Sequence, residues 1–411
     1  MKILILAIIS ILNRNPMNPV RDRLPKAAVS HLRCLFSNGV NRIICLLILF
    51  LLASPNLWAG EILRRKTMDK DSVYLNETNL KNPFGVLEFL HWNHPWNNYK
   101  YSCNRDLEKA VFLMQEAGVG WVRVDFLWGD IEPQEGSFDF AKYDCIVELL
   151  RSKGMHILGI LHYSTDWASA CGKWNCSPKD NKVFVNYASK VIERYKTQVK
   201  YWELWNEPDS VTYWKEQDGL KTYCVLLKEV YTAAKRIDPE CKILNGGIAN
   251  GLSSINHLYD NGAKDYFDIL NIHFFETPEH AGGIKAVESY PKLAYKIMQR
   301  NGDKDKKIWV TEIGCPGVKK GLKVEDWWMG KNPTERQQTE WVKNVYTTLL
   351  KDPHVEKIFW AFFRDTKDHW KNGVDYFGLL RWDYSAKPSF KAYKECFQEW
   401  KKNKAIKLKG K

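Results

Sequence analysis

The 411-residue sequence lacks the long apolar run that a membrane-spanning helix requires. Its apolar stretch Ile43–Leu52 holds about ten residues, whereas a helix that spans a bilayer needs about 20. Cysteine and histidine are not clustered at the spacing of a zinc site, so no structural zinc ion is expected. Low-complexity segments and internal repeats, apart from an alternation of strands and helices, are also missing. These absences favour a folded globular domain.

The central part of the chain also lacks net charge, although the whole chain carries +13. Residues 1–59 hold seven basic residues against one acidic residue, and residues 401–411 hold six lysines and no acidic residue. The remaining residues 60–400 are therefore close to neutral, at +1. This distribution argues against nucleic acid as a partner. The basic tail 401–411 is interpreted as a solvated run, and a weak affinity for an anionic polymer or membrane surface stays open.

Residues 1–59 have the form of an export presequence. Arg42 precedes the apolar run Ile43–Leu52, as a charged segment precedes the apolar core of a signal peptide, and Ala59 offers a small residue for cleavage. We therefore expect an exported protein, periplasmic or extracellular, with an uncleaved membrane anchor as the alternative. Residues 60–81 are polar and charged and are interpreted as a lead-in segment.

Eight cysteines lie outside the presequence, and an even number in an exported chain permits disulfides. Most of the possible pairings stay open. Cys171 and Cys176 stand close together in C-G-K-W-N-C, and their spacing in an exported chain makes them the expected disulfide pair.

Between residue 82 and about residue 400, apolar strand-like runs alternate with helical patterns, which indicates a parallel sheet. Eight strands and eight helices are what a closed (β/α)8 barrel requires, so the sequence predicts an α/β fold with a single TIM barrel over residues 82–400. The last helix is expected to end near Trp400. The expected strands are Phe84–Phe89, Trp121–Phe126, His156–His162, Tyr201–Trp205, Lys242–Asn245, Phe267–His273, Lys307–Glu312 and Lys357–Phe362.

Two of these strands end in a glutamate. Y-W-E-L-W-N-E-P-D places Glu207 just before Pro208, which cannot continue a strand ladder. K-K-I-W-V-T-E-I-G-C-P places Glu312 at the end of a second apolar run. Either glutamate alone is weak evidence, because most glutamates near strand ends are solvated or ion-paired. Catalytic residues of such barrels lie at the carboxyl ends of the strands, and two carboxylates there indicate an acid and a nucleophile facing one sugar.

The W-N-E-P and W-V-T-E-I-G motifs resemble those of the glycoside hydrolase clan A barrels. Within the clan the sequence is most similar to family 39 and its β-xylosidase-like relatives, with the cellulase family 5 as a neighbour. The resemblance implies a retaining hydrolase of β-O-glycosidic bonds in an oligo- or polysaccharide. Glu207 would be the general acid/base and Glu312 the nucleophile, and neither a metal ion nor an organic cofactor would be needed.

The resemblance also implies a set of substrate-binding residues. Arg123 would hydrogen-bond the nucleophile and keep it ionised, although a structural ion pair with Glu203 is an alternative role. His162 and His273, at the ends of strands 3 and 6, would line the sugar subsite. Asn206 would hold the sugar 2-OH, and Trp360 would form the floor of the subsite.

The sequence departs from the clan pattern in two ways. Phe275 stands where the clan commonly has a tyrosine that hydrogen-bonds the nucleophile, so another group such as Tyr163 would have to supply that bond. Residues 401–411 leave no room for the β-sandwich usual in family 39 xylosidases.

Other functions and features stay open at this point. A non-catalytic glycan-binding barrel or a transglycosylase would use the same two glutamates or the same cleft, and the oligomeric state is not predicted. The chain holds 18 tryptophans, enough for both a heavy core and sugar-stacking rings. The tryptophans expected on loops at the catalytic face are Trp92, Trp96, Trp128, Trp167, Trp214, Trp327 and Trp370.

Overall fold

The computed structural model describes residues 80–97, 101, 104–216 and 218–409. The predicted presequence 1–59 and nearly all of the lead-in segment 60–81 lie outside these residues. Among the residues described, no helix combines the length and the apolar character needed to cross a bilayer.

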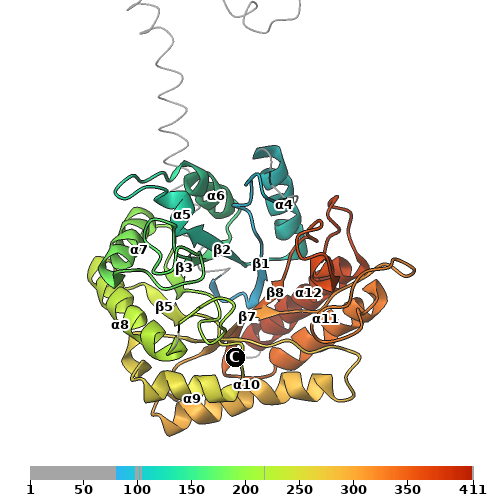
Figure 1. The fold of residues 1–411 in the computed structure, drawn as a ribbon. Coiled ribbons are helices and arrows are strands. Elements are labelled where there is room, and N and C mark those ends of the chain that lie inside the picture. The colour runs from blue at the N-terminus through green and yellow to red at the C-terminus, as the bar shows by residue number, and fades with distance from the viewer. Residues whose placement is uncertain (1–79, 98–100, 102–103, 217, 410–411) are drawn as a thin grey trace, which may run out of the picture. The chain divides into compact units, whose positions relative to one another are not determined.

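Eight parallel strands form the centre of the fold, and helices surround them (Figure 1). The strands are β1 (Phe84–Leu87), β2 (Trp121–Leu127), β3 (His156–His162), β4 (Tyr201–Leu204), β5 (Lys242–Asn245), β6 (Leu270–His273), β7 (Ile308–Ile313) and β8 (Val355–Ala361). Their order in the sheet is β5-β4-β3-β2-β1-β8-β7-β6. Two parallel bridges, Leu244–Ile269 and Ile248–Ile272, join the β5 and β6 edges, so the barrel is nearly closed. The predicted (β/α)8 fold is confirmed.

The connections between strands are mostly helical. The α-helices are α4 (Asn104–Ala117), α5 (Trp128–Ile131), α6 (Ala141–Ser152), α7 (Asn181–Tyr195), α8 (Gly219–Ile237), α9 (Leu252–Asp260), α10 (Gly283–Arg300), α11 (Glu335–Leu349) and α12 (Pro388–Lys409), and the short 3-10 helices are η2 (Lys264–Tyr266) and η3 (Gly373–Tyr376). The principal helices each place apolar residues on one buried face, for example Val342, Val345 and Leu349 of α11. This spacing is what an amphipathic helix needs to cover a sheet.

The final helix is longer than the sequence pattern predicts. It continues past Trp400 to Lys409, through a stretch that was interpreted as a solvated tail. Lysine, alanine and leucine favour helix, and no glycine or proline interrupts the stretch before Gly410. Residues 401–409 therefore continue the helix that begins at Pro388.

The amino-terminal end of the barrel is closed by a layer of large apolar side chains. Trp121, Trp309 and Phe359 are fully buried there, together with Leu158 and Leu244. The indole rings of Trp121 and Trp309 meet edge to face with centroids 4.9 Å apart. This layer fills the interior at one end, and the polar residues of the barrel interior are left for the opposite, carboxyl end, where loops carry function in such folds.

Candidate active site

Glu207 lies three residues beyond the end of β4, on a backbone with two left-handed residues. Trp205 has φ of 65° and Glu207 has φ of 44°, both rare for residues that carry a Cβ. Pro208 follows and disfavours the right-handed helical region for the residue before it. Backbone in this region costs about 1–3 kcal/mol per residue and is typically retained where it aims a functional side chain.

Glu312 lies within β7, beside His273 of β6. The register of the two strands pairs these residues directly, with an irregularity in β6 between Ile272 and His273. Neighbouring parallel strands therefore bring the Glu312 carboxylate and the His273 imidazole together. The His273 Nδ1 atom lies 3.0 Å from Glu207 Oε1 and 3.8 Å from Glu312 Oε1, so the imidazole stands between the two carboxylates.

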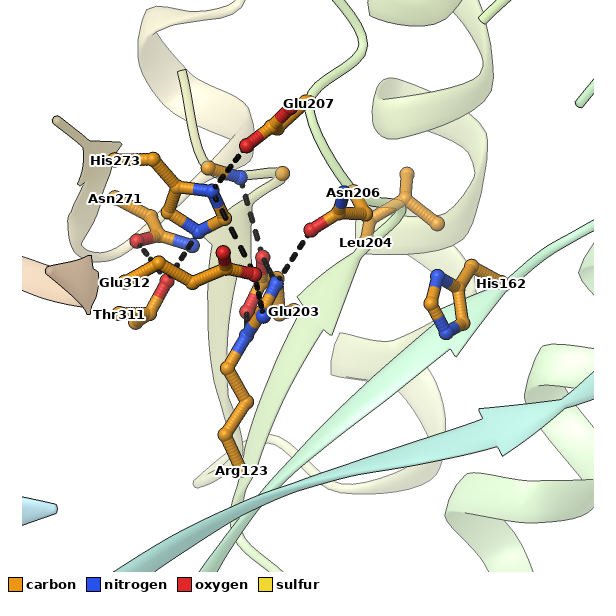
Figure 2. Close-up of polar contacts among 12 residues, drawn as sticks. Arg123, His162, Glu203, Leu204, Asn206, Glu207, Asn271, His273, Thr311 and Glu312 are labelled. Carbon is orange, nitrogen blue, oxygen red and sulfur yellow. Dashed lines mark hydrogen bonds and ion pairs between the residues drawn. The ribbon is translucent and has the colours of Figure 1, made fainter. Parts of the chain in front are cut away.

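Arg123 of β2 connects the acidic groups of the site (Figure 2). Its Nε and Nη2 atoms each donate to one oxygen of Glu203, both at 2.7 Å. Its Nη1 atom donates to Glu312 Oε1 at 2.5 Å, and Nη2 also donates to Asn206 Oδ1 at 2.9 Å. Both roles considered for Arg123, the structural pair with Glu203 and the contact with Glu312, are therefore made at once.

A chain of hydrogen bonds orients His273 (Figure 2). Thr311 Oγ1 donates its proton to Asn271 Oδ1 at 2.6 Å, so at the 2.8 Å contact with His273 Nε2 the hydroxyl acts as acceptor. Burial, followed by the charge of Arg123, lowers the pKa of His273 well below its usual range, so the ring is neutral. A neutral ring that donates from Nε2 accepts at Nδ1, and Nδ1 faces Glu207, which must then supply a carboxyl proton.

The two glutamates have raised pKa values for the same principal reason. Burial, followed by the charge of Glu312, raises the pKa of Glu207 well above its usual range. Burial raises the pKa of Glu312 to about 7, against the lowering effect of Arg123. Arg123 thus acts in the predicted direction, but burial outweighs it, so the pKa of Glu312 is raised and not lowered. Glu207 holds its proton more firmly than Glu312 does.

His162, another of the predicted binding residues, lies apart from the two glutamates (Figure 2). It is buried, and its Nε2 atom lies 3.6 Å from Asp125, whose other carboxylate oxygen is 3.7 Å from His91. Neither imidazole has a hydrogen-bond partner among the residues described. The three side chains therefore form a second polar group with unused hydrogen-bonding capacity.

The structure differs from the sequence-based expectations at two points: the exposure of Trp360 and the residue that hydrogen-bonds Glu312. Trp360 is completely buried and donates from its indole nitrogen to the Phe377 carbonyl at 3.0 Å, so it offers no exposed face to a sugar. Phe275 packs edge to face on Trp328, and among the described residues Arg123, not Tyr163, hydrogen-bonds Glu312.

Several residues near the site were missed in the sequence analysis. Gly247 is one, because a Cβ there would lie 2.0 Å from His273 Nε2, so only glycine leaves room for the imidazole. Thr311 is another, although it stands in the W-V-T-E-I-G motif directly before Glu312. His91 is a third, and no local pattern distinguishes it from an ordinary core residue. Trp174 was also overlooked, although its position between two cysteines was a usable signal. The disulfide Cys171–Cys176 itself is present, as predicted.

The cluster also contains the residue types of a metal site. One ligand atom each of Glu207, His273 and Glu312 lie within 4.8 Å of one another. However, the guanidinium of Arg123 already contacts Glu312 and carries a fixed positive charge that repels a cation. The donor set is therefore better suited to holding protons than to holding a metal ion.

Comparison with known proteins places this geometry in a family. A family model described as "Beta-galactosidase" matches residues 97–165, and one described as "Glycosyl hydrolase catalytic core" matches residues 174–393. A family 39 glycoside hydrolase from Bacteroides cellulosilyticus WH2 has a similar fold, with a TM-score of 0.61 and 23% identity, over 77% of this chain and 64% of that one. Xylanase 10B from Thermotoga maritima also has a similar fold, with a TM-score of 0.55 and 18% identity. The match covers 79% of this chain and 97% of that one.

Curated relatives match shorter segments. Endo-1,4-beta-xylanase A from Phanerodontia chrysosporium is 28% identical over 123 residues, which are 28% of this chain and 29% of that protein. A beta-glucosidase-like protein from Oryza sativa subsp. japonica is 29% identical over 114 residues, or 25% of this chain and 18% of that protein. The chain thus spans less than a third of either relative. Because the catalytic-core model covers more than half of the chain, and the barrel it describes is the one observed, the chain belongs to the glycosyl hydrolase catalytic core family of clan A (β/α)8 barrels.

Proposed function

We propose that the protein is a retaining β-glycosidase in which Glu312 is the nucleophile and Glu207 the general acid/base. The observation that carries this proposal is the closeness of the two carboxyl groups, with one oxygen of each within 4.8 Å of the other. Retaining glycosidases hold these groups about 5–5.5 Å apart, whereas inverting enzymes leave about 6.5–9.5 Å for a water molecule. The separation thus supports direct attack by a carboxylate on the sugar.

The proton distribution supports the same assignment of roles. Glu207, which holds its proton more firmly and contacts a neutral His273, is suited to donate that proton to the leaving oxygen. Glu312 loses its proton more readily, because Arg123 donates a charge-assisted hydrogen bond to it. The pair therefore functions with one proton, carried on Glu207.

The reaction then proceeds in two displacements. Glu312 attacks the anomeric carbon while the glycosidic C–O bond breaks and the leaving oxygen takes the Glu207 proton. Glu207, now ionised, takes a proton from water as the water oxygen attacks the same carbon and releases Glu312. In this proposal Asn206, whose Oδ1 accepts from Arg123, binds the sugar 2-OH, and His162, Asp125 and His91 bind further hydroxyls.

The substrate is proposed to be a β-linked oligo- or polysaccharide. Relatives carry the names xylanase, beta-glucosidase-like protein and beta-galactosidase, so xylo-, cello- and β-galacto-oligosaccharides form the first panel to test. Products are identified by mass spectrometry, and transfer to a sugar acceptor would appear there as products longer than the substrate.

Stereochemistry tests the mechanism directly. Proton NMR of the first-formed product should show the β anomer before mutarotation, because two displacements at one carbon restore its configuration. An α anomer appearing first would contradict the assignment of Glu312 as nucleophile.

Two substitutions separate the roles of the glutamates. Glu312→Ala should abolish turnover of every substrate, by several orders of magnitude. Glu207→Ala should spare the first step with aryl glycosides, because a good leaving group needs little protonation. A glycan-binding barrel without catalysis would bind members of the panel and release nothing from them in any of the three proteins.

Export is also part of the proposal. The disulfide Cys171–Cys176 agrees with an oxidising compartment. Amino-terminal sequencing of protein recovered outside the cytoplasm should give a mature chain that begins near Gly60. A chain that still begins at Met1 would favour an uncleaved anchor.

A further inference from the structure

The disulfide loop, residues 169–177, presents a tryptophan at the carboxyl face of the barrel. Trp174 lies between Cys171 and Cys176 and is 47% exposed. The loop follows the end of β3, so it stands on the same face as Glu207, which follows β4. What distinguishes Trp174 from other exposed rings is that it lies on a loop closed by a disulfide, next to the catalytic face.

Hydrogen bonds hold the loop on both sides. On the β3 side, Ser164 donates from its backbone nitrogen to the Trp174 carbonyl at 2.9 Å and from its hydroxyl to the Cys176 carbonyl at 2.7 Å. On the β4 side, the Asn175 carbonyl accepts from the Lys215 nitrogen at 2.8 Å, and Asn175 Nδ2 donates to the Thr212 carbonyl at 2.9 Å. Trp174 is thus fixed between the end of β3 and the segment after Glu207.

Two tyrosines complete an aromatic wall, which we define as Tyr163, Trp174 and Tyr213. The Trp174 and Tyr163 rings meet edge to face at 4.7 Å, and Trp174 lies 6.2 Å from Tyr213. Tyr163 and Tyr213 are nearly parallel, with an interplanar angle of 10° and centroids 6.4 Å apart. Both tyrosines are half-buried, so the wall has a fixed base and one exposed ring.

The wall lies close to the proposed acid, because Tyr213 follows Glu207 in the chain at a short distance and the charge of Glu207 acts on both tyrosines. The Glu207 carbonyl accepts from the Ser210 nitrogen at 2.9 Å, and the Ser210 carbonyl accepts from the Tyr213 nitrogen at 3.0 Å, so Tyr213 lies two successive turns beyond Glu207. Burial, followed by the charges of Glu207 and Glu312, raises the pKa of Tyr213, which agrees with this closeness.

The chemistry of the reaction determines which part of the substrate lies on this side of the site. A general acid protonates the leaving oxygen, so the leaving group must lie beside the acid, while the nucleophile attacks from the opposite face of the sugar. We propose that the aromatic wall binds the leaving-group sugar, with a pyranose face stacked on Trp174. This inference rests on the proposed function and deepens it, because it makes oligosaccharides, with a sugar as leaving group, the preferred substrates.

Paired substrates test the proposal. Xylotetraose has a sugar leaving group, whereas β-xylosyl fluoride loses only fluoride and places nothing against the wall. Cellotetraose and β-glucosyl fluoride form a second pair. Trp174→Ala should lower kcat/KM for the tetrasaccharides by about tenfold, mostly by raising KM. For the fluorides, the same substitution should lower kcat/KM by less than about twofold.

Two control variants define the outcome. Trp174→Phe keeps an aromatic ring and should recover most of the lost kcat/KM. Phe112→Ala removes a ring that is 55% exposed on α4, away from the strand ends, and should change neither substrate class. An equal loss on tetrasaccharides and fluorides in Trp174→Ala, or no loss on either, would overturn the proposal.

A binding measurement separates this proposal from the proposed function. If the wild-type protein releases no product from either pair or from the β-galacto-oligosaccharides of the panel, the proposed function fails. Calorimetric titration with xylotetraose and cellotetraose then tests sugar binding by the wall independently of catalysis. Weaker binding to Trp174→Ala than to wild type and Phe112→Ala supports a sugar-binding wall. Equal binding to all three proteins, or no binding to any, contradicts it.

Discussion

At the residue scale, the candidate site is a small set of charges kept in place by one arginine and one neutral histidine. Arg123 neutralises two carboxylates, Glu203 and Glu312, while His273 accepts a hydrogen bond from the protonated carboxyl group of Glu207. The backbone nitrogen of Gly247 also donates to Glu203, at 3.1 Å. Each charged group thus has a partner, which is what allows three carboxylates to share a buried space.

The pH dependence of kcat/KM follows from the two raised pKa values. Glu312 must be ionised to attack, and its pKa is about 7, so activity should fall about tenfold per pH unit below pH 7. Glu207 must stay protonated, so activity should fall again above its own, higher pKa. With a glycosyl fluoride, which needs no acid, wild type and Glu207→Gln should both keep the acid limb and both lack the alkaline limb. A wild-type profile that is flat from pH 5 to 9 would falsify these assignments.

Thr311 provides a test of how His273 holds the acid. Thr311→Val removes the hydroxyl that accepts from Nε2, so the ring can carry its proton on Nδ1 and donate to Glu207 instead. Donation stabilises the ionised carboxylate, so the pKa of Glu207 and the alkaline limb of the pH profile should fall by about one unit. Thr311→Ser keeps the hydroxyl and should leave the limb in place. An unmoved limb in Thr311→Val would mean that Thr311 has only a packing role.

At the element scale, the ends of strands and helices determine where the site stands. β4 ends at Leu204, and two left-handed residues then turn Glu207 toward β6 and β7. β7 places Glu312 in register with His273. The helices behind these strands need well-defined ends of their own, because a frayed helix would leave the outer face of the strands uncovered.

The capping box of α11 is one such end. Thr334 accepts from the Gln337 backbone nitrogen, and the Gln337 side chain accepts from the Thr334 backbone nitrogen at 2.9 Å. Thr334→Ala should lower the free energy of unfolding in urea by about 1 kcal/mol. Thr347→Ala, at an exposed position within the same helix, should have little effect or stabilise slightly, because alanine is the better helix former. Equal losses in both variants would argue against capping as the cause.

At the scale of the whole molecule, the barrel separates stability from chemistry. The apolar layer around Trp121 and Trp309 closes the amino-terminal end, while the charged cluster lies at the carboxyl end. The β5 and β6 edges are joined by isolated bridges and by hydrogen bonds between Asn245 and Asn271, and not by a continuous ladder, so packing in this layer contributes to holding the barrel closed. Substitutions in the apolar layer should therefore change the free energy of unfolding, and substitutions in the charged cluster should change activity.

Trp309→Ala tests that separation. Trp309 is fully buried against Trp121, Tyr201 and Phe359, so truncation should lower the free energy of unfolding by about 3–5 kcal/mol. The kcat/KM per folded molecule should stay near the wild-type value. Trp382→Ala, which removes a ring that is 52% exposed, should cost less than about 1 kcal/mol. A large loss of kcat/KM in folded Trp309→Ala would show that the two ends are coupled.

The sequence by itself determined the barrel, the positions of its two glutamates at strand ends and the disulfide Cys171–Cys176. These features depend on local signals: apolar periodicity, a proline or glycine after a strand, and a short spacing between cysteines. The extension of α12 to Lys409 depends on an equally local signal, because lysine, alanine and leucine favour helix, but a run of lysines is also typical of a solvated tail. Even so, strand bounds were predicted to within about three residues.

Only the tertiary structure decided what surrounds those glutamates. Arg123 contacts residues 80 and 189 positions away, and no sequence pattern states which of them it meets or that it meets both. The same holds for burial, which raises the pKa of Glu312 to about 7, covers Trp360 completely and leaves Trp174 exposed. Burial depends on how every strand and loop packs around a side chain, so it is a property of the assembled barrel and of no single stretch of the chain.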